Sequence, residues 1–270
     1  MTTVADNHFD AWIAALEERH LADLTFPELS RALRALSFSY FEGRTMARNN
    51  RGAVHGALSG AGKRAAFALF YGPLHYMFVD RVVARLDTSS TTRIPARTLI
   101  DLGCGTGGAS AAWAVRSRTS RVIGIDRNTW ALAEAAHTYR HFGLRAETRR
   151  GELSRARLPK SPAVLLAAFV LNELPESDRD ALLHALLLRA KTTGDPVLII
   201  EPIARSVAPW WGKWAAAFAD AGGSSAEWRF DVELPPVLRK LDRAAGLQHR
   251  ELTGRTLWLS TGAGESAPTY

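Results

Sequence analysis

Three alternating glycines could bring a backbone turn close to a ligand. In the stretch LIDLGCGTGGAS, Gly103, Gly105 and Gly107 follow an apolar run and precede a helical pattern, and Asp101 lies two residues before the first of them. Glycine lets the backbone turn tightly and approach a bound molecule, and free amides at a helix start favour a polar or anionic group. Read with Gly108 as the last glycine, the stretch also fits the dinucleotide fingerprint, which is weak evidence by itself. The sequence therefore predicts a cofactor loop here.

A second polar group ends the apolar run AVLLAAFVL. The run starts at Ala163 and stops at Asn172 and Glu173, just before Pro175. Such a run is typical of a strand buried on both faces, so its polar end is expected at the rim of a sheet, where ligands collect. Asn172 could hydrogen-bond a reacting molecule and Glu173 could take its proton. The alternative is that both residues merely cap the helix expected over residues 175–191.

Aromatic residues follow the next expected strand. The stretch EPIARSVAPWWGKWAAAF contains Trp210, Trp211 and Trp214. Trp211 and Trp214 lie three residues apart and share a face of the helix expected over residues 210–221, so core packing can explain them. The alternative is an aromatic wall for a flat acceptor, since every base offers a face on which to stack. These residues, with Tyr76, form the predicted acceptor side.

Composition limits the classes of protein to consider. The formal charge is +7 and the sequence pI is about 10.0, which could indicate an anionic partner such as nucleic acid. Arginine outnumbers lysine 29 to 5 and the basic residues are scattered, so a genomic bias is the competing explanation. No apolar stretch approaches the roughly 18 residues of a membrane span, and the start lacks the pattern of a secretory signal. We therefore expect a cytoplasmic protein with no membrane partner.

Cysteine and histidine usage bears on metal sites. Cys104 is the only cysteine, which excludes internal disulfides and cysteine-rich zinc or iron–sulfur sites within one chain. The eight histidines show no ligand spacing such as H-E-x-x-H. We therefore predict no metal. Cys104 itself is expected to be simply a small residue, since nothing in the sequence marks a paired base that would activate it.

The elements that would position these residues form two regions. Residues 8–88 carry helical periodicity, with Thr25 three residues before Glu28 in a capping-box pattern and an expected bend at Gly72 and Pro73. From about residue 97, strands alternate with helices, which implies a parallel sheet covered by helices on both sides. The final segments LQHREL and RTLWLST are too close together for a crossover helix, so an antiparallel hairpin is expected.

From about residue 94 to its end, the chain resembles the class I S-adenosylmethionine-dependent methyltransferases. The resemblance rests on LIDLGCGTG with Asp101 inside the strand end, on the long helical region before it, and on the expected antiparallel end of the sheet. It implies an α/β fold with a Rossmann-like seven-stranded, mostly parallel sheet whose last strand is antiparallel. It also implies S-adenosyl-L-methionine as cofactor and S-adenosyl-L-homocysteine as product. The expected domains are an N-terminal helical subdomain, residues 1–90, for acceptor recognition or as a lid, and a methyltransferase domain, residues 91–270.

The resemblance assigns residues to the cofactor one by one. Asp101 and the glycine loop would face its methionine part, and Asp126, at the end of RVIGID, would accept hydrogen bonds from the ribose hydroxyls. An exposed strand-end aspartate is the alternative for Asp126. Glu152 stands where the family often keeps an acidic residue beside the adenine amino group, whereas Arg127 departs from the apolar residue often found there. The predicted cofactor-binding residues are Asp101, Gly103, Cys104, Gly105, Gly107, Asp126, Arg127, Glu152, Leu153 and Phe169.

The acceptor is less constrained. Amino-methylating enzymes that act on nucleic-acid bases or glutamine often carry Asn/Asp-Pro-Pro-Tyr/Phe after the fourth strand, and VLNELP departs from that pattern. In order along the chain, LSFSYFEGR, FALFYGPLHYMFVDRVVARL, LIDLGCGTG, FVLNEL and EWRF look like a divergent member of the small-ribosomal-subunit methyltransferase-like family. Many members of that family hold an iron–sulfur cluster through several cysteines, which this chain lacks.

Three hypotheses follow for the function. The first is methylation of RNA, most plausibly ribosomal RNA. The second is methylation of a small metabolite in a Trp-lined pocket, with the N-terminal helices as a lid. The third is a cofactor-binding ribosome assembly factor that transfers no methyl group. In both enzymatic hypotheses, Asn172 and Glu173 are the candidate catalytic residues, because methyl transfer is an in-line displacement in which positioning does most of the work.

Overall fold

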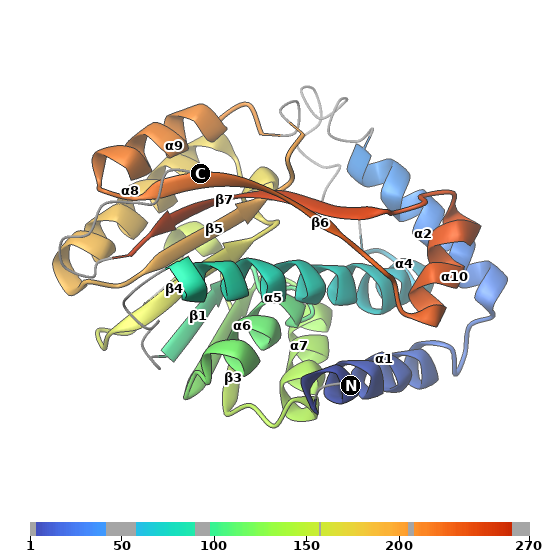
Figure 1. Ribbon diagram of the computed structural model, residues 1–270. Coiled ribbons are helices and arrows are strands. Elements are labelled where there is room, and N and C mark those ends of the chain that lie inside the picture. Colours follow the sequence, from blue (N-terminus) through green and yellow to red (C-terminus); the bar gives the residue numbers. More distant parts are fainter. Residues whose placement is uncertain (1–3, 42–57, 90–97, 157, 205–207, 261–270) are drawn as a thin grey trace. The chain divides into compact units, whose positions relative to one another are not determined.

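The computed structural model describes residues 4–41, 58–89, 98–156, 158–204 and 208–260 (Figure 1). The chain divides into two compact units. The first comprises residues 1–75 and 231–252, and the second comprises residues 76–230 and 253–270. This division differs from the sequence-based boundary at residue 90, because a helix near the C-terminus packs with the N-terminal helices. Local periodicity does not reveal which distant segment a helix packs against.

The first unit consists mainly of helices. Its elements are α1 (Val4–His20), α2 (Phe26–Phe41), α4 (Ala61–Ala66), η1 (Phe67–Tyr71) and α10 (Pro236–Ala245). The expected cap is present at the start of α2, where the Glu28 carboxylate accepts hydrogen bonds from the Thr25 amide at 2.8 Å and the Thr25 hydroxyl at 2.6 Å. Most of the glycine-rich segment between Gly43 and Gly62 lies outside the described residues.

A π-helical turn occupies the position of the expected bend. Element η1 is a π-helix, and the Gly72 amide donates to the Phe67 carbonyl, five residues earlier. Pro73 has no amide hydrogen to donate, which favours a local change of hydrogen-bond spacing. Helix α5 (Gly72–Ser89) continues directly from this turn into the second unit.

The second unit is built on one seven-stranded sheet with the order β3-β2-β1-β4-β5-β7-β6. Strands β1 to β5 pair in parallel, and β7 pairs antiparallel with β5. This confirms the predicted Rossmann-like, mostly parallel sheet. The strands are β1 (Thr98–Leu102), β2 (Arg121–Asp126), β3 (Ala146–Arg150), β4 (Ala163–Ala168), β5 (Val197–Glu201), β6 (Ser224–Asp231) and β7 (Glu251–Leu259).

Helices cover both faces of this sheet. Figure 1 shows α8 (Glu176–Thr193) and α9 (Trp211–Asp220) on one face, and α6 (Gly108–Ser117) and α7 (Thr129–His141) on the other. Ile100, Leu165 and Ile199 belong to the buried cluster that includes α8 and α9. Side chains alternate along a strand, so Asp101 points to the opposite face, toward α6 and α7. The side chain of Asp101 is therefore surrounded by residues of α6 and α7, and not by the cluster beneath α8 and α9.

The expected hairpin at the C-terminus is wrong. Residues 251–259 form the single strand β7, and its outer neighbour is β6, 20 or more residues earlier in the chain. The two expected segments belong to one strand, and Gly254, which lies between them, does not turn the chain. A Cβ at Gly254 would lie 2.5 Å from Phe78 Cζ, so glycine is needed there for the close approach of an aromatic ring.

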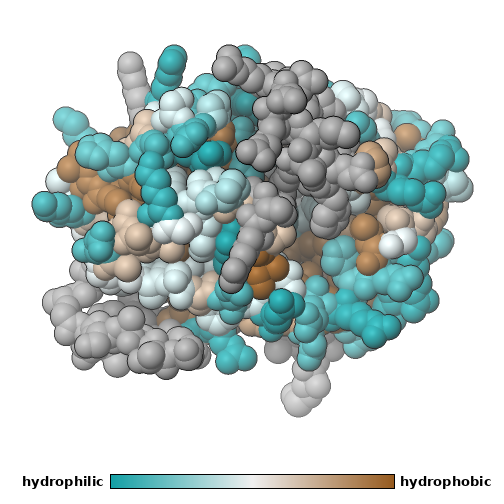
Figure 2. All heavy atoms as spheres, turned by 90° about the horizontal axis from the view of Figure 1, so that it is seen from above, coloured by the Kyte–Doolittle hydropathy of each residue, from teal (hydrophilic) through white to brown (hydrophobic). Residues whose placement is uncertain are grey.

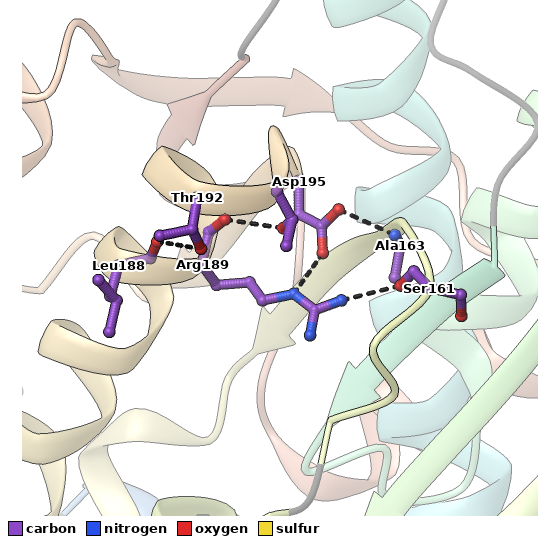
Figure 3. Close-up of polar contacts among 7 residues, drawn as sticks. Ser161, Ala163, Leu188, Arg189, Thr192 and Asp195 are labelled. Carbon is purple, nitrogen blue, oxygen red and sulfur yellow. Dashed lines mark hydrogen bonds and ion pairs between the residues drawn. The ribbon is translucent and has the colours of Figure 1, made fainter.

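A buried ion pair joins β4 and β5 at their amino ends (Figure 3). Asp195, whose side chain is fully buried, accepts a hydrogen bond from the Ala163 amide at 3.0 Å and pairs with Arg189 Nε at 2.6 Å. Arg189 also donates to the Ser161 carbonyl at 2.8 Å. This network fixes the two strands at the edge opposite their carboxyl ends.

None of the described helices is both long enough and apolar enough to cross a membrane. On the face shown in Figure 2, hydrophilic and hydrophobic residues are interspersed.

Candidate functional site

Three chain segments meet at the carboxyl ends of β2, β1 and β4. They are residues 126–128 at the end of β2, residues 103–107 after β1, and residues 169–173 after β4. These strands are neighbours in the sheet and run in parallel, so their ends share one edge. In open α/β sheets this edge, next to a change in strand order, is where ligands bind. Most predicted site residues therefore come together.

The glycine loop is a strained turn held by the neighbouring strand. Gly103, Gly105 and Gly107 have φ angles of 79°, 51° and 80°, in the left-handed region that favours glycine. The amides of Gly103 and Cys104 donate to the Ile125 carbonyl at 2.8 and 3.1 Å. The predicted loop thus has the backbone conformation that its glycines suggest.

Asp126 connects the end of β2 to this loop. Its carboxylate accepts hydrogen bonds from the Gly105 amide at 3.0 Å and the Asn128 amide at 2.8 Å. Burial raises its pKa, and the amides of Asn128 and Gly105 offset part of that effect. A carboxylate can accept about four hydrogen bonds, so acceptor capacity remains for a ligand. Asn128 in turn caps α7 by accepting from the amides of Trp130 and Ala131.

Asp101 is a buried carboxyl group without a hydrogen-bond partner among the described residues. Its side chain is 1% exposed and neither oxygen is hydrogen-bonded. Its pKa is raised to about 7, chiefly by burial and in part by the negative charge of Asp126, while Ser110 partly offsets this rise. A buried acid that has no partner is costly, so the position requires a reason beyond packing. A positively charged ligand group would supply that reason.

Helix α7 packs against the glycine loop through Tyr139. Tyr139 is 1% exposed, and its hydroxyl lies 2.8 Å from Ser110 Oγ. A Cβ at Gly107 would lie 2.9 Å from Tyr139 Cε1, so the ring fills the space beneath the turn. Cys104 is buried, and burial raises the pKa of its thiol well above the usual value. The thiol is therefore neutral at physiological pH, which disfavours a nucleophilic role.

Phe169 occupies a strained conformation at the end of β4. Its φ angle is 58°, which is rare for a residue with a Cβ. Its amide donates to the Ile200 carbonyl at 2.8 Å, and its ring packs edge-on against Phe78 at 5.9 Å. Strained residues that packing holds in place cluster at functional sites. The turn at Phe169 directs the following residue, Val170, against Gly103.

The predicted adenine-side residues lie next to the end of β2. The Gly151 amide donates to the Asp126 carbonyl at 3.0 Å, which brings the start of η2 (Leu153–Arg155) to this edge. Leu153 is 5% exposed and packs in the core, while Glu152 is exposed. The role of Glu152 beside adenine stays a prediction.

An ion pair between Arg127 and Glu173 connects the chain segments that follow β2 and β4. Arg127 follows β2 and Glu173 ends η3 (Leu171–Glu173), which follows β4. Arg127 Nη2 lies 3.5 Å from Glu173 Oε2, and the side chains are 32% and 28% exposed. Since β1 lies between β2 and β4, this pair bridges the end of β1. Glu173 is thus an accessible carboxylate beside the glycine loop.

Asn172 is held in a buried network that the sequence did not reveal. Its amide group donates to Glu201 Oε2, and its oxygen accepts from Trp210 Nε1 at 3.1 Å. Glu201, which is 0% exposed, also accepts from the Leu171 amide at 2.8 Å. Glu201 ends the apolar run of β5 just as Asn172 follows that of β4, so the same signal could have identified it.

Neither predicted catalytic residue caps α8. That helix begins after Pro175 and has no side-chain hydrogen bond at its cap. Instead, Arg179 reaches back from its first turn and donates to the Leu174 carbonyl at 2.6 Å. The capping alternative for Asn172 and Glu173 therefore has no support in this structure.

The predicted acceptor-side aromatic residues are largely engaged with protein groups. Trp214 is 0% exposed and stacks with Phe218, as the core-packing alternative requires. The Arg255 guanidinium lies 4.3 Å from the ring centroid of Trp211. Tyr76 is 6% exposed and stacks on Phe142 at 5.2 Å. Trp210 is linked to the site through its hydrogen bond to Asn172.

No group of three or more potential metal ligands occurs among the described residues.

Known proteins resemble this chain in sequence and in fold. Residues 99–194 match a family model described as a methyltransferase domain. A trans-aconitate 2-methyltransferase from Azoarcus sp. strain BH72 is 33% identical over 165 residues, or 56% of this chain and 61% of that protein. The chain therefore matches less than two thirds of the length of this relative.

A solved structure with low sequence identity shares the fold. An O-methyltransferase family protein from Burkholderia thailandensis is 18% identical with a TM-score of 0.57, covering 93% of this chain and 77% of that chain. The mitomycin 7-O-methyltransferase MmcR is 16% identical with a TM-score of 0.49, covering 96% of this chain and 76% of that chain.

Proposed function

We propose that the site at the ends of β1, β2 and β4 binds S-adenosylmethionine for methyl transfer, which is supported by the match of residues 99–194 to a family model described as a methyltransferase domain. The observation that carries this proposal is the buried, unpartnered carboxyl group of Asp101 beside the glycine loop. The cofactor has an ammonium group and a positively charged sulfur. Either would offset the cost of a buried carboxylate.

The other residues of the site fit the same cofactor. Gly103 leaves no room for a side chain at the turn, since a Cβ there would lie 2.4 Å from Val170. Asp126 would bind the ribose hydroxyls with its remaining acceptor capacity, and Glu152 would lie beside the adenine. Arg127 would border the adenine with its aliphatic stem.

S-adenosylmethionine supplies a methyl group on a positively charged sulfur that is a good leaving group. We assign Glu173 as the base that accepts the acceptor's proton, because it is a partly exposed carboxylate at the end of β4. Asn172 has both polar groups engaged with Glu201 and Trp210, so we assign it to positioning the turn that carries Glu173.

We propose RNA as the acceptor. The formal charge of +7 favours a polyanion, since phosphate contacts supply much of the affinity of nucleic-acid-binding proteins. A Trp-lined pocket for a small metabolite has less support, because Trp214 is buried and Trp211 is covered by Arg255.

A small carboxylic acid is the second candidate acceptor. It is favoured by the 33% identity to a trans-aconitate 2-methyltransferase. A carboxylate is already deprotonated at neutral pH and needs no base, so this alternative makes Glu173 dispensable. The two acceptors thus make opposite predictions for the same residue.

The test is to incubate the protein with S-adenosylmethionine labelled on the methyl group, together with ribosomal RNA in one reaction and trans-aconitate and related acids in another. Label in RNA supports the main proposal, and label in the acids supports the alternative. An Asp101→Asn variant serves as the control for cofactor-dependent transfer. Binding of the cofactor without transfer to any acceptor in cell extract would instead indicate a non-catalytic assembly factor.

A further inference from the structure

A groove in the first unit lies between the start of α2 and α10. Its volume is about 530 Å³, and the residues that line it are Phe26, Pro236, Arg239, Lys240, Arg243 and Ala244. We call it the basic groove, because three of these six residues are cations. The helix geometry explains this grouping, since residues 239 and 243 are four apart and residues 240 and 243 are three apart on α10.

Two of the three cations are available to a ligand. Lys240 and Arg243 are exposed, and neither forms an ion pair with an acidic side chain among the described residues. The Lys240 ammonium group lies 4.3 Å from the ring centroid of Phe26, which places it over the wall of the groove. Such cations are free to exchange solvent counterions for a bound anion.

The groove is also structurally fixed. Arg239 donates from Nε and Nη2 to the Leu234 carbonyl at 3.2 and 2.9 Å, so its guanidinium is held in one orientation. Arg34 on α2 donates to the Ala244 carbonyl at 2.7 Å and ties the end of α10 to α2. A site whose walls and one cation are already ordered loses less entropy when it binds a ligand.

The acidic groups nearby do not cancel this charge. Glu233 pairs with Arg239 at 3.1 Å, and Glu28 at the start of α2 is engaged with Thr25. Asp242, the acid within α10, is buried and bonded to His249. The groove therefore retains the charges of Lys240 and Arg243.

We propose that the basic groove binds backbone phosphates of RNA, which deepens and rests on the proposed RNA acceptor. Phosphates suit it better than a single carboxylate, because Lys240 and Arg243 are two separate cations on an open groove and an RNA strand presents phosphates in series. RNA bound here would contact α10 as well as the start of α2. The RNA-binding surface would then include a helix near the C-terminus in addition to the N-terminal helices.

The test compares two double variants with the same change in charge. Lys240→Gln with Arg243→Gln removes two cations from the groove. Lys160→Gln with Lys191→Gln removes two exposed cations from the second unit and is the matched control. Binding of a fluorescent single-stranded RNA is measured across a salt series, with inorganic phosphate and citrate as competitors. Cofactor binding and thermal unfolding of each variant report that the fold is intact.

The groove variant should bind RNA about tenfold more weakly at low salt, and the slope of log affinity against log salt should fall by about 1.4, or about 0.7 for each lost phosphate contact. The control should keep wild-type affinity within a factor of about two. Equal losses in both variants, or none in the groove variant, would overturn the proposal. So would competition by citrate as strong as that by RNA, which would assign the groove to a small acid.

Failure of the groove and failure of the proposed function give different results. If wild-type protein methylates RNA and the groove variant binds and methylates it normally, the groove proposal falls and the function stands. If the groove variant alone loses RNA binding but wild-type protein methylates no RNA, the groove stands and the acceptor proposal falls.

Discussion

Gly103 packs so closely against Val170 that a side chain at residue 103 would clash with it, since a Cβ on Gly103 would lie 2.4 Å from Val170 Cγ2. Gly103 turns the chain after β1, and Val170 follows the strained Phe169 at the end of β4. The two sequence features that suggest function, a glycine loop and a polar strand end, are therefore in direct contact. A change in either turn is transmitted to the other.

Gly103→Ala should destabilise the fold and abolish cofactor binding. It combines left-handed backbone strain with a clash against Val170, for a total cost of about 2–5 kcal/mol. Gly143→Ala is the matched control, because Gly143 has a φ of 63° but nothing lies within 4 Å of its Cβ position. That variant should lose only about 1–2 kcal/mol. Urea unfolding and cofactor titration measure both, and equal losses would refute the steric argument.

Cofactor affinity should rise with pH through the pKa of Asp101. That pKa is about 7 in the protein without cofactor, and a positively charged ligand favours the ionised form. The dissociation constant for S-adenosylmethionine should therefore fall about tenfold between pH 6 and pH 8. Asp101→Asn should bind weakly at every pH. Methylthioadenosine, which lacks the amino-acid part and the positive charge, is the control ligand and should show no pH dependence.

The same group should make stability depend on pH in the absence of cofactor. The pKa of Asp101 is raised in the folded state, so its favourable contribution is present below the unfolded value near 4 and is lost as pH rises toward 7. About three pKa units correspond to roughly 4 kcal/mol. Asp101→Asn removes this loss. Urea unfolding should show the variant gaining stability relative to wild type between about pH 4 and pH 7 and no further gain above that range, and a constant difference would contradict this account.

Glu173→Gln should leave stability and cofactor binding unchanged while lowering methyl transfer about 100-fold or more, since a general base contributes at least that much. Glu176→Gln is the control, because it neutralises an exposed carboxylate three residues later. Asn172→Ala should behave differently. It removes the side-chain donor to Glu201 Oε2, although the Leu171 amide still donates to Oε1, and it should cost about 1–3 kcal/mol of stability as well as activity. Transfer that survives Glu173→Gln would remove Glu173 as the base.

The features that could be predicted from the sequence are those that depend on residues close to one another along the chain. The glycine loop, the apolar run of β4 and the Thr25–Glu28 cap are each encoded within about ten residues. The loop and the cap lie where they were predicted, whereas the strand occupies only the first part of the run, Ala163–Ala168, and Leu171 begins η3. The contacts of Asn172 with Glu201 and Trp210 join residues 29 and 38 positions apart, so no local pattern specifies them. The hairpin was wrong for a related reason, since Gly254 serves the distant ring of Phe78 and not a turn.

Arg189→Ala should destabilise the protein without altering the site. The variant removes the guanidinium partner of the buried Asp195 carboxylate, which keeps the hydrogen bond from the Ala163 amide, at a cost of about 3–5 kcal/mol (Figure 3). Lys213→Ala is the control, because it breaks an exposed ion pair with Asp180 and should cost no more than about 1 kcal/mol. Below the unfolding transition, both variants should bind S-adenosylmethionine with wild-type affinity, because the network lies at the edge of the sheet opposite the glycine loop. Weakened binding by a folded Arg189→Ala protein would show that the two edges are coupled through β4.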